Sequence, residues 1–490
     1  MTSPPNMGAS LAHRAALQGE RTAVIVEQSG ERIPYAELDR WANGLARALL
    51  ACGVQPGDRV ALDLPSEPLY LALYFACARL GAILVPLNSR LSAPELRFQV
   101  EDCEPRVLIA RESPVADAPG VLHLTPETLR EHATETAPLA EEAPGGETPQ
   151  ILMYTSGTTG SPRGALLPHR KTLHNTRNAL RYFALSERDV VVAPVPLFHS
   201  FGLLILSVPT LFCGATLVLV DRFDATGIQD TIARHAASLF GGVPVMYQRM
   251  LRSGLRADAL RSLRLAFSAG APLAVDVIQR FCAAGTPLVQ GYGQTETSIL
   301  CCLDPEHALS RAGSIGRPVS PGDVVVGDAS GREVPRGQRG EVLVRGPSVM
   351  LGYWRQPEAT AASRVAGWHR TGDLAVMDDE GFVTLVGRRS DLYISGGENV
   401  YPAEVERTLE AFPQVAEAAV IGVPDPEWGE TGRAYVVPSG ESLDREALLR
   451  FAREHLAGFK LPRQVVCVER LPRTASGKVQ KHLLRERMDV

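Results

Sequence analysis

Residues 154–170 read YTSGTTGSPRGALLPHR. The apolar run Ile151–Tyr154 at their start predicts a buried strand, and a helix-like segment follows them. The glycines let backbone N–H groups turn inward, while the hydroxyls and the Arg163 cation add further donors. The stretch therefore predicts a loop that holds an anion such as a polyphosphate. A flexible Gly/Ser/Thr linker is the alternative.

This loop differs from a Walker A loop, the phosphate loop of P-loop kinases and GTPases. That motif places a second glycine and a lysine at set distances after its first glycine. After Gly157 those two places hold Pro162 and Arg163. A P-loop kinase or GTPase is therefore not predicted, and a phosphate-binding role remains open.

Size and composition limit the class of protein. A chain of 490 residues exceeds one ordinary core, which predicts two or more domains. Its 45% apolar and 21% charged residues are typical of a globular protein, and a net charge of −5 does not favour a nucleic-acid partner. The eight cysteines form no CxxC pair, and Met1–Ala12 lacks the features of a signal peptide. We therefore expect free thiols and a cytoplasmic location.

Residues 190–220 contain no Lys, Arg, Asp or Glu. Their later part, 201–220, is as long as a membrane span, but proline and glycine interrupt it repeatedly. Instead of an integral membrane span we expect three buried segments: a strand near 190–194, a helix near 201–212 and a strand at 215–220.

Helix-like and strand-like segments alternate along the N-terminal part of the chain. Tyr35–Cys52 and Pro68–Leu80 have helical spacing, whereas Arg59–Leu64 and Ile83–Pro86 read as short strands. This alternation predicts parallel sheets covered by helices. Residues 113–149, rich in Pro, Ala, Glu and Thr, predict a loose surface segment.

The pattern changes further along. Glycine and proline become dense at 313–350, and short strands such as Val324–Val326 predict an antiparallel barrel or distorted sheet there. A further unit of helices, strands and a basic tail follows. We therefore divide the chain into an N-terminal domain, 1–388, and a C-terminal domain, 389–490.

A second candidate site is residues 290–297, which read QGYGQTET. The Tyr292 ring, flanked by glycines, can lie against a nucleobase. Thr295 offers a hydroxyl to a phosphate, and Glu296 offers a hard oxygen ligand for Mg²⁺. The alternative is a helix N-terminus that Thr295 caps, with a surface glutamate after it.

Three later segments add polar groups in glycine-rich surroundings. Asp373, after a Gly turn, can accept hydrogen bonds from a ribose diol, and Arg388 can hold a ribose or a phosphate. The pair Gly396–Gly397 allows close approach of a thin ligand. Lys478 lies in a Ser-Gly loop. Structural turns and a solvated charge are the alternatives for these residues.

Together these segments resemble the motifs of the adenylate-forming superfamily of acyl-CoA synthetases, luciferases and peptide-synthetase adenylation domains. The resemblance covers nearly the whole chain, with all the motifs in order. It implies an α/β protein: a large N-terminal domain with two sheet-and-helix subdomains plus a small β-barrel, and a smaller mobile α+β C-terminal lid domain. It also implies a carboxylic acid–CoA ligase that uses ATP, Mg²⁺ and coenzyme A.

The resemblance implies roles for the matching positions. The phosphate loop comprises Thr155, Ser156, Gly157, Thr158, Thr159, Gly160 and Arg163. The rest of the ATP site comprises Gly270, Ala271, Gly291, Tyr292, Thr295, Asp373 and Arg388, with Thr155 and Glu296 as metal ligands and Lys478 between the carboxylate and the α-phosphate. The path of the acyl group and coenzyme A comprises His199, Gly202, Phe240, Gly241, Ala269, Gln290, Gly396 and Gly397. The catalytic residues among these are Lys478, Thr295, Glu296 and His199.

The implied reaction has two steps. The carboxylate first attacks the α-phosphate of ATP, and coenzyme A then cleaves the acyl-AMP. Two residues depart from the family pattern: Arg163 stands where the phosphate loop usually carries a lysine, and Ser390 stands at the usual Asp or Lys of the hinge. These departures put the handling of pyrophosphate and the position of the hinge in question.

The segments implied for the acyl group carry no Arg or Lys. A dicarboxylate such as malonate would need a cation at its far end, which Gln290 does not provide. An amino acid would need an aspartate for its ammonium, which Phe240 and Gly241 do not provide. We therefore expect an apolar monocarboxylic acid, with fatty acids first and aromatic acids of the cinnamate, ferulate or benzoate kind second.

Coenzyme A is the expected acceptor, and a carrier-protein phosphopantetheine is the alternative. A non-catalytic nucleotide-binding protein is the alternative of a different class. The presence of Lys478, Glu296, Asp373 and Arg388 argues against that alternative.

Overall fold

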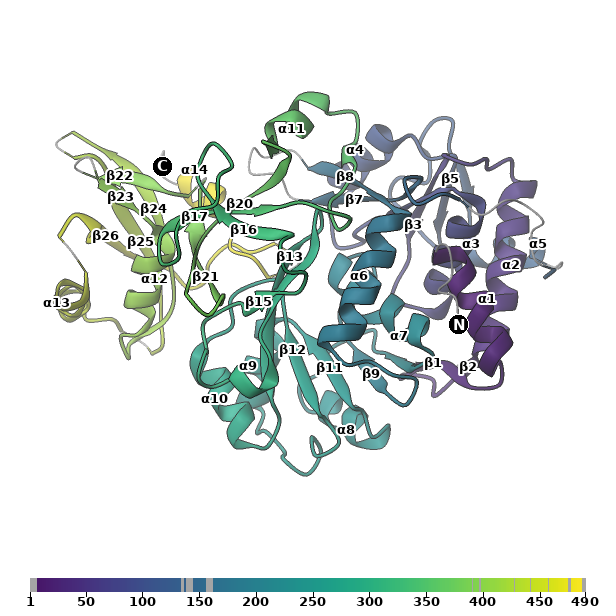
Figure 1. Ribbon diagram of the computed structural model, residues 1–490, viewed down its shortest axis with the longest axis horizontal. Helices are drawn as coiled ribbons and strands as arrows, with labels where there is room; N and C mark the ends of the chain where they lie inside the picture. Colours follow the sequence, from purple (N-terminus) through teal and green to yellow (C-terminus); the bar gives the residue numbers. More distant parts are fainter. Residues whose placement is uncertain are drawn as a thin grey trace. The chain divides into compact units, whose positions relative to one another are not determined.

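The computed structural model divides into two units (Figure 1). The first contains most of the chain up to Val324 together with Val344–Arg364, and the second contains Val325–Leu343 and the chain from Val365 onward. The structure describes residues 7–133, 136–137, 144–155, 162–389, 391–395, 398–426, 428–440, 442–456, 458–474 and 477–486.

A nine-stranded sheet forms one half of the first unit. Its inner strands are short apolar runs buried on both faces, the type of strand that forms parallel sheets under helices. All neighbours from β1 through to β13 are parallel, and antiparallel strands close both edges. The order is β15 (Arg317–Pro318), β14 (Ser298–Cys302), β13 (Leu288–Gln294), β12 (Leu265–Ser268), β11 (Leu239–Gly242), β9 (Val190–Ala193), β10 (Thr216–Leu219), β1 (Thr22–Val26) and β2 (Arg32–Pro34).

A seven-stranded sheet forms the other half of this unit. Its strands from β7 to β6 are parallel, whereas β8 runs antiparallel to both β7 and β18. In the sequence, the predicted phosphate loop falls between these two paired strands, β7 and β8. The order is β18 (Gly352–Tyr353), β8 (Arg163–Pro168), β7 (Pro149–Thr155), β4 (Ile83–Pro86), β3 (Arg59–Asp63), β5 (Val107–Ala110) and β6 (Leu122–Leu124).

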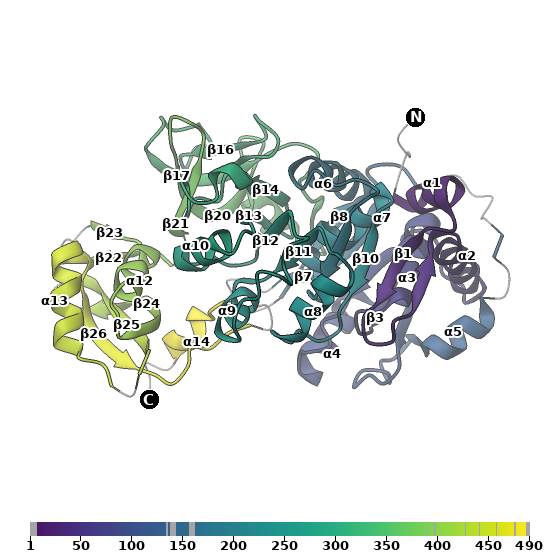
Figure 2. The ribbon, with the colours of Figure 1, turned by 90° about the horizontal axis from the view of Figure 1, so that it is seen from below.

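Helices cover these sheets. α3 is apolar on all sides and buried, and it packs against α1 and α2 (Figure 2). α6 contacts both β8 and β14, so it lies between the two sheets. The helices are α1 (Met7–Gln18), α2 (Tyr35–Ala51), α3 (Pro68–Leu80), α4 (Ala93–Cys103), α5 (Pro126–His132), α6 (His169–Tyr182), the π-helix η1 (Phe201–Ser207), α7 (Val208–Cys213), α8 (Gly227–Arg234), α9 (Pro244–Arg252), α10 (Val275–Ala283), the 3₁₀ turn η2 (Pro305–His307) and α11 (Pro357–Ala362).

The second unit contains two five-stranded sheets. The first comprises β16 (Val324–Gly327), β17 (Arg339–Val344), β20 (Trp368–Met377), β19 (Arg364–Val365) and β21 (Val383–Arg388). The second comprises β23 (Glu398–Val400), β22 (Tyr393–Ser395), β25 (Gly429–Pro438), β24 (Val415–Asp425) and β26 (Pro462–Cys467). An apolar core joins this second sheet to α12 (Pro402–Glu410) and α13 (Arg445–His455), and α14 (Lys481–Glu486) packs on β24.

The predicted alternation of strands and helices is confirmed, and the predicted helix Pro68–Leu80 coincides with α3. The expectation of a loose segment at 113–149 is wrong in part. Leu122–Leu124 form β6, which extends the seven-stranded sheet beside β5, and α5 follows. The domain boundary near residue 388 stays a prediction.

The helix expected near 201–212 is a π-helix followed by α7. Pro209 has no N–H to continue a regular ladder, and the Asn175 amide donates to the Leu204 carbonyl instead, at 2.7 Å. The Ser207 hydroxyl donates to the carbonyl of Gly202 at 2.7 Å. Among the described residues, no helix is both long and apolar enough to cross a membrane.

His169, at the start of α6, predicts a pH-dependent stability. Its side chain is buried, and neither ring nitrogen has a hydrogen-bond partner within the described part of the chain. Burial lowers the pKa of His169 from 6.5 to about 4. The unfolded chain therefore binds a proton that the folded chain excludes, and the free energy of unfolding decreases as the pH falls from 6.5 to about 4.

We expect His169 to account for a loss on the order of 3 kcal/mol across this interval. Urea denaturation of the wild type and of His169→Met, at pH values that span the interval, measures it. The variant should lose clearly less stability on acidification. Equal losses in the two proteins would contradict the prediction.

Candidate active site

The β7–β8 hairpin presents Thr155 and Arg163 directly opposite each other. The Thr155 hydroxyl lies 3.4 Å from the Arg163 carbonyl oxygen and donates to Oε1 of Glu296 at 3.3 Å. Ser156, Gly157, Thr158, Thr159 and Gly160, predicted as the phosphate loop, lie outside the described residues. The described ends of the hairpin thus place a hydroxyl and a cationic residue at the base of that loop.

Glu296 brings the two sheets of the first unit together. Its side chain is buried in the turn between β13 and β14, and its Oε1 also accepts a hydrogen bond from the Tyr353 hydroxyl at 3.2 Å. Burial and then the neighbouring Glu296 raise the pKa of Tyr353, so the phenol stays protonated and donates. The Arg163 guanidinium lies 5.5 Å from the centre of the Tyr353 ring. A buried carboxylate among hydroxyls offers the hard oxygen ligands that Mg²⁺ prefers.

The turn that carries Glu296 has a shape that depends on glycine. β13 and β14 form an antiparallel hairpin, so the alternative of a helix capped by Thr295 is wrong. A Cβ on Gly293 would lie 2.0 Å from the Ser298 carbonyl oxygen, which only glycine avoids. Tyr292, the predicted adenine contact, is buried on β13.

The predicted acyl segments lie at or just after the carboxyl ends of parallel strands in the nine-stranded sheet. Gly241 on β11 lies opposite Phe267 on β12, and Ser268 lies opposite Gln290 on β13. Ala269, Gly270 and Ala271 follow β12 directly. Ligands of such sheets bind at this edge.

The segment with His199 reaches the same edge from β9. The hydroxyl of Ser200 lies 3.4 Å from that of Thr295. The rings of Phe198 and His199 are 4.6 Å apart. A Cβ on Gly202 would lie 2.3 Å from the Pro196 carbonyl oxygen, so glycine is required for this loop to fold back on itself.

Two of the predicted acyl-path residues have other contacts. The Gln290 amide is buried and bonded to the backbone at both ends, accepting from Leu273 at 3.2 Å and donating to Ser314 at 2.7 Å. Phe240 is fully buried, with its ring 5.4 Å from that of Tyr247. Both side chains are therefore engaged in contacts within the protein.

The second unit holds the predicted ribose pair. Asp373 and Arg388 face each other across β20 and β21, with Nε of Arg388 3.2 Å from Oδ1 of Asp373. The buried Glu341 carboxylate fixes this turn, because it accepts the Gly372 N–H at 2.9 Å and an Arg370 N–H at 2.7 Å. The pairing was predicted, whereas Glu341 had no recognisable signal in the sequence.

Lys478 lies in a tight turn of the second unit. Arg473 and Val479 are bridged across this turn, and the Lys478 backbone N–H donates to the Thr474 hydroxyl at 3.1 Å. The Lys478 side chain is exposed. Gly396, Gly397 and Ser390 lie outside the described residues.

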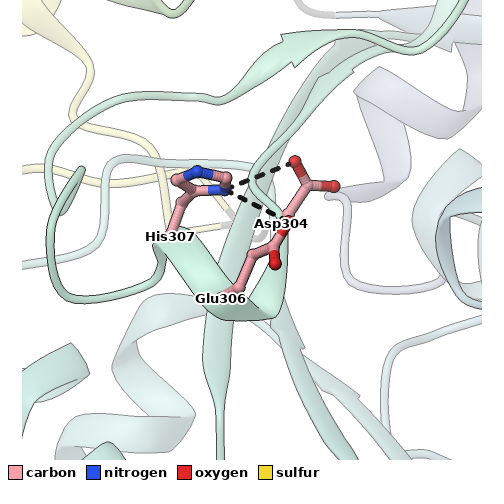
Figure 3. Close-up of side chains that lie close together, drawn as sticks. All are labelled: Asp304, Glu306 and His307. Atoms are coloured by element: carbon pink, nitrogen blue, oxygen red, sulfur yellow. Dashed lines mark ion pairs between the residues drawn. The ribbon is translucent and has the colours of Figure 1, made fainter.

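Asp304, Glu306 and His307 gather around η2 (Figure 3). Nδ1 of His307 lies 3.7 Å from Asp304 and 3.8 Å from Glu306. The two acids are exposed, and all three residues lie within one turn of the chain, which is common without a bound ion.

Comparison with known families identifies the chain. The AMP-binding enzyme family matches residues 11–354, and the AMP-binding enzyme C-terminal domain matches residues 404–478. The chain belongs to the family of AMP-binding enzymes.

The chain is similar to three acid–CoA ligases over nearly its whole length. It is 42% identical to feruloyl-CoA synthase of Amycolatopsis sp, over 95% of this chain and 96% of that one. It is 39% identical to indoleacetate–CoA ligase of Aromatoleum aromaticum, over 96% of both chains. It is 35% identical to long-chain-fatty-acid–CoA ligase FadD13 of Mycobacterium tuberculosis, over 98% of both.

A solved structure of o-succinylbenzoate coenzyme A synthetase (MenE) from Bacillus subtilis, in complex with ATP and magnesium ion, matches with a TM-score of 0.89. The identity is 33%, over 99% of this chain and 100% of that one. These similarities confirm the predicted α/β architecture and the acid–CoA ligase branch. The chain is an AMP-forming acid–thiol ligase, with a carboxylic acid, ATP and coenzyme A as its substrates.

Tyr353→Phe tests the contacts of Glu296. The change removes the hydroxyl that donates to the buried carboxylate and keeps the ring beside Arg163. Because hydrogen bonds to charged groups are the stronger ones, we expect KM for ATP to rise about tenfold. Steady-state kinetics at saturating acid measures the change.

Tyr247→Phe is the matched control, since it removes a buried hydroxyl that donates to the Phe267 carbonyl at 2.7 Å, away from Glu296. It should lower thermal stability and leave KM for ATP unchanged. A Tyr353→Phe enzyme with the wild-type KM would show that the phenol does not support the site.

Proposed function

We propose that this ligase activates an aromatic monocarboxylic acid of the ferulate or indoleacetate kind. The observation that carries the proposal is the 42% identity to feruloyl-CoA synthase along 95% of the chain, against 35% to the long-chain-fatty-acid ligase. The sequence alone favours fatty acids first, and this similarity reverses that order. A fatty acid stays the second candidate.

The residues at the carboxyl edge of the sheet agree with a flat, uncharged acyl body. The Phe267 ring packs directly over Gly291, where a Cβ would lie 2.5 Å from it, and the Phe201 ring lies 5.8 Å from that of Phe267. The Gln290 amide is occupied by backbone partners, so it does not offer a group for a second carboxylate. An aromatic ring gains from such neighbours through edge and face contacts.

In the first step we assign Thr155 and Glu296 to a Mg²⁺ ion that accompanies ATP. The buried carboxylate with its hydroxyl neighbours fits such an ion, which when bound would neutralise phosphate charge. Tyr292 with Gly270 and Ala271 is assigned to the adenine, Thr295 to a phosphate, and the Asp373–Arg388 pair to the ribose.

We assign Lys478 to the position between the carboxylate of the acid and the α-phosphate of ATP, where its ammonium group would contact both. Two unit charges at about 4 Å repel by roughly 4 kcal/mol at an effective dielectric near 20. That repulsion would slow the step about a thousandfold, and an ammonium between the two anions offsets it. The side chain of Lys478 is exposed, in a turn of the second unit.

For the second step we propose that a pocket of the second unit holds the nucleotide end of coenzyme A. The pocket has a volume of about 340 Å³, and Arg453, Arg463, Trp428 and Phe459 are among its lining residues. The Arg463 guanidinium lies 5.1 Å from the Trp428 ring centre. Aromatic and cationic groups side by side suit an adenine with phosphates.

The remaining proposals concern the thiol that accepts the acyl group and the location of the protein in the cell. We propose free coenzyme A, with a carrier-protein phosphopantetheine as the alternative, and a C-terminal domain that moves as a lid between the two steps. A cytoplasmic location agrees with the eight cysteines, which are all free thiols.

A panel of acids tests the substrate class. AMP release with ATP, Mg²⁺ and coenzyme A should give its highest kcat/KM on ferulate, indoleacetate or benzoate, and lower values on octanoate and palmitate. Malonate, as a dicarboxylate, should be inactive. A ranking led by fatty acids would reject the aromatic assignment and keep the ligase class.

Lys478→Ala tests the charge argument on the best acid. Pyrophosphate exchange should fall by about three orders of magnitude, because nothing replaces the ammonium between the two anions. Lys478→Arg keeps the charge and should retain part of the activity. Wild-type exchange in Lys478→Ala would remove Lys478 from the mechanism.

Arg463→Gln tests the coenzyme A pocket. We expect KM for coenzyme A to rise about tenfold, with pyrophosphate exchange unchanged, because only the second step uses the pocket. With pantetheine as acceptor, which lacks the nucleotide, the variant and the wild type should be equal. Arg450→Gln, an exposed arginine on α13 paired with Glu446, is the control. Equal KM values for coenzyme A in both variants would contradict the assignment.

A further inference from the structure

Lys171 on α6 lies beneath the turn that carries Glu296. Its side chain is only 1% exposed, and its Nζ donates to the Ser298 hydroxyl at 2.6 Å. Burial lowers the pKa of Lys171 to about 7, and the charge of Glu296 opposes that decrease. Lys171 is thus electrostatically linked to the carboxylate and bonded to the residue two places after it.

Burying a lysine side chain in a protein core is energetically unfavourable. Removing an ammonium from water costs more than one hydrogen bond to a hydroxyl returns, and an apolar side chain of similar size is often as stable or more so. Met or Leu at this position of α6 would pack without that cost. The lysine therefore points to a purpose other than stability.

Ser298 is the residue through which Lys171 acts on the turn. Its backbone φ is +64°, a left-handed conformation that a serine adopts only when its surroundings hold it. Its carbonyl lies where a Cβ of Gly293 would be, so the two ends of the hairpin turn touch at Ser298. Fixing Ser298 fixes the path of Thr295, Glu296 and Thr297 between them.

We propose that Lys171 is a positioning residue that holds the Thr295–Ser298 turn, and with it the Glu296 carboxylate, in the geometry that binds ATP with its metal ion. This inference rests on the proposed roles of Thr295 and Glu296. Lys171 does not touch the substrate and acts through Ser298. Its removal weakens nucleotide binding and the first step, and it does not weaken the fold.

Three variants test the proposal. Lys171→Met removes the ammonium and keeps the volume, Ser298→Ala removes its acceptor, and the third combines both. We expect the Kd for Mg²⁺ with a non-hydrolysable ATP analogue, measured by calorimetry, to rise at least tenfold in Lys171→Met, since small misplacements of an aligned group have large effects. The melting temperature should stay equal or increase.

The Kd of the double variant should be no higher than that of the single variant with the higher Kd, because both changes break the same hydrogen bond between Lys171 and Ser298. Thr176→Val is the control: it alters a buried hydroxyl on the same helix that has no hydrogen-bond partner in the described part of the chain. It should leave the Kd unchanged.

A wild-type Kd in Lys171→Met, additive effects in the double variant, or a weakened Kd that accompanies a lower melting temperature would overturn the proposal. If Lys171→Met does not fold, Ser298→Ala decides, and an unchanged Kd there overturns it. The Kd needs no acid, so failure of the acid panel with a raised Kd would reject the proposed substrate and keep this role of Lys171.

Discussion

The candidate site of the first unit depends on the hydrogen bonds that the buried Glu296 carboxylate accepts. Glu296 belongs to the nine-stranded sheet, yet both its hydroxyl partners, Thr155 and Tyr353, belong to the seven-stranded sheet. A buried carboxylate without partners is costly, so the two sheets must meet where these hydroxyls can reach it. The same contact places Thr155, the first residue of the predicted phosphate loop, beside the β13–β14 turn.

The helix between the sheets continues this logic. Three of the polar side chains that α6 buries bond to different elements: Asn175 bonds to the π-helix, Thr172 to Gln150 on β7, and Lys171 to β14. A purely apolar helix could slide or rotate against its neighbours. Directional bonds from one helix to both sheets and to the π-helix set one register for the edge where the acyl segments and the turn converge.

Much of the fold could be predicted from the sequence because it depends on local pattern. Apolar runs such as Ile83–Pro86 read as buried strands, and Pro68–Leu80, ending at a glycine, reads as a helix. The Asp373–Arg388 pair was predicted by motif, and the register of β20 with β21 brings it together. The π-helix was not predictable, since it depends on the Asn175 amide meeting a carbonyl that Pro209 leaves without a donor.

The supporting residues that the sequence did not reveal share one property: each contacts a partner far away along the chain. Glu341 serves a turn about 30 residues later, Tyr353 meets Glu296 from 57 residues away, and Lys171 reaches Ser298 across 127. Nothing near Lys171 distinguishes it from a surface lysine. Its burial follows only from the three-dimensional meeting of α6 with β14.

The positions of the cationic side chains show why contacts between residues far apart in the sequence are important. The reaction joins two anions. Cationic side chains must therefore lie where negative charge develops in the transition state, without binding the product so tightly that it cannot leave. Arg163 lies beside the Tyr353 ring in the first unit, and Arg388 is paired with Asp373 in the second, so contacts within each unit orient both guanidinium groups. Lys478 instead sits exposed in a turn. Under the proposed mechanism, a lysine on a C-terminal domain that moves would serve the first step and then leave, whereas groups aligned by buried contacts, such as Lys171 with Ser298, would stay in place.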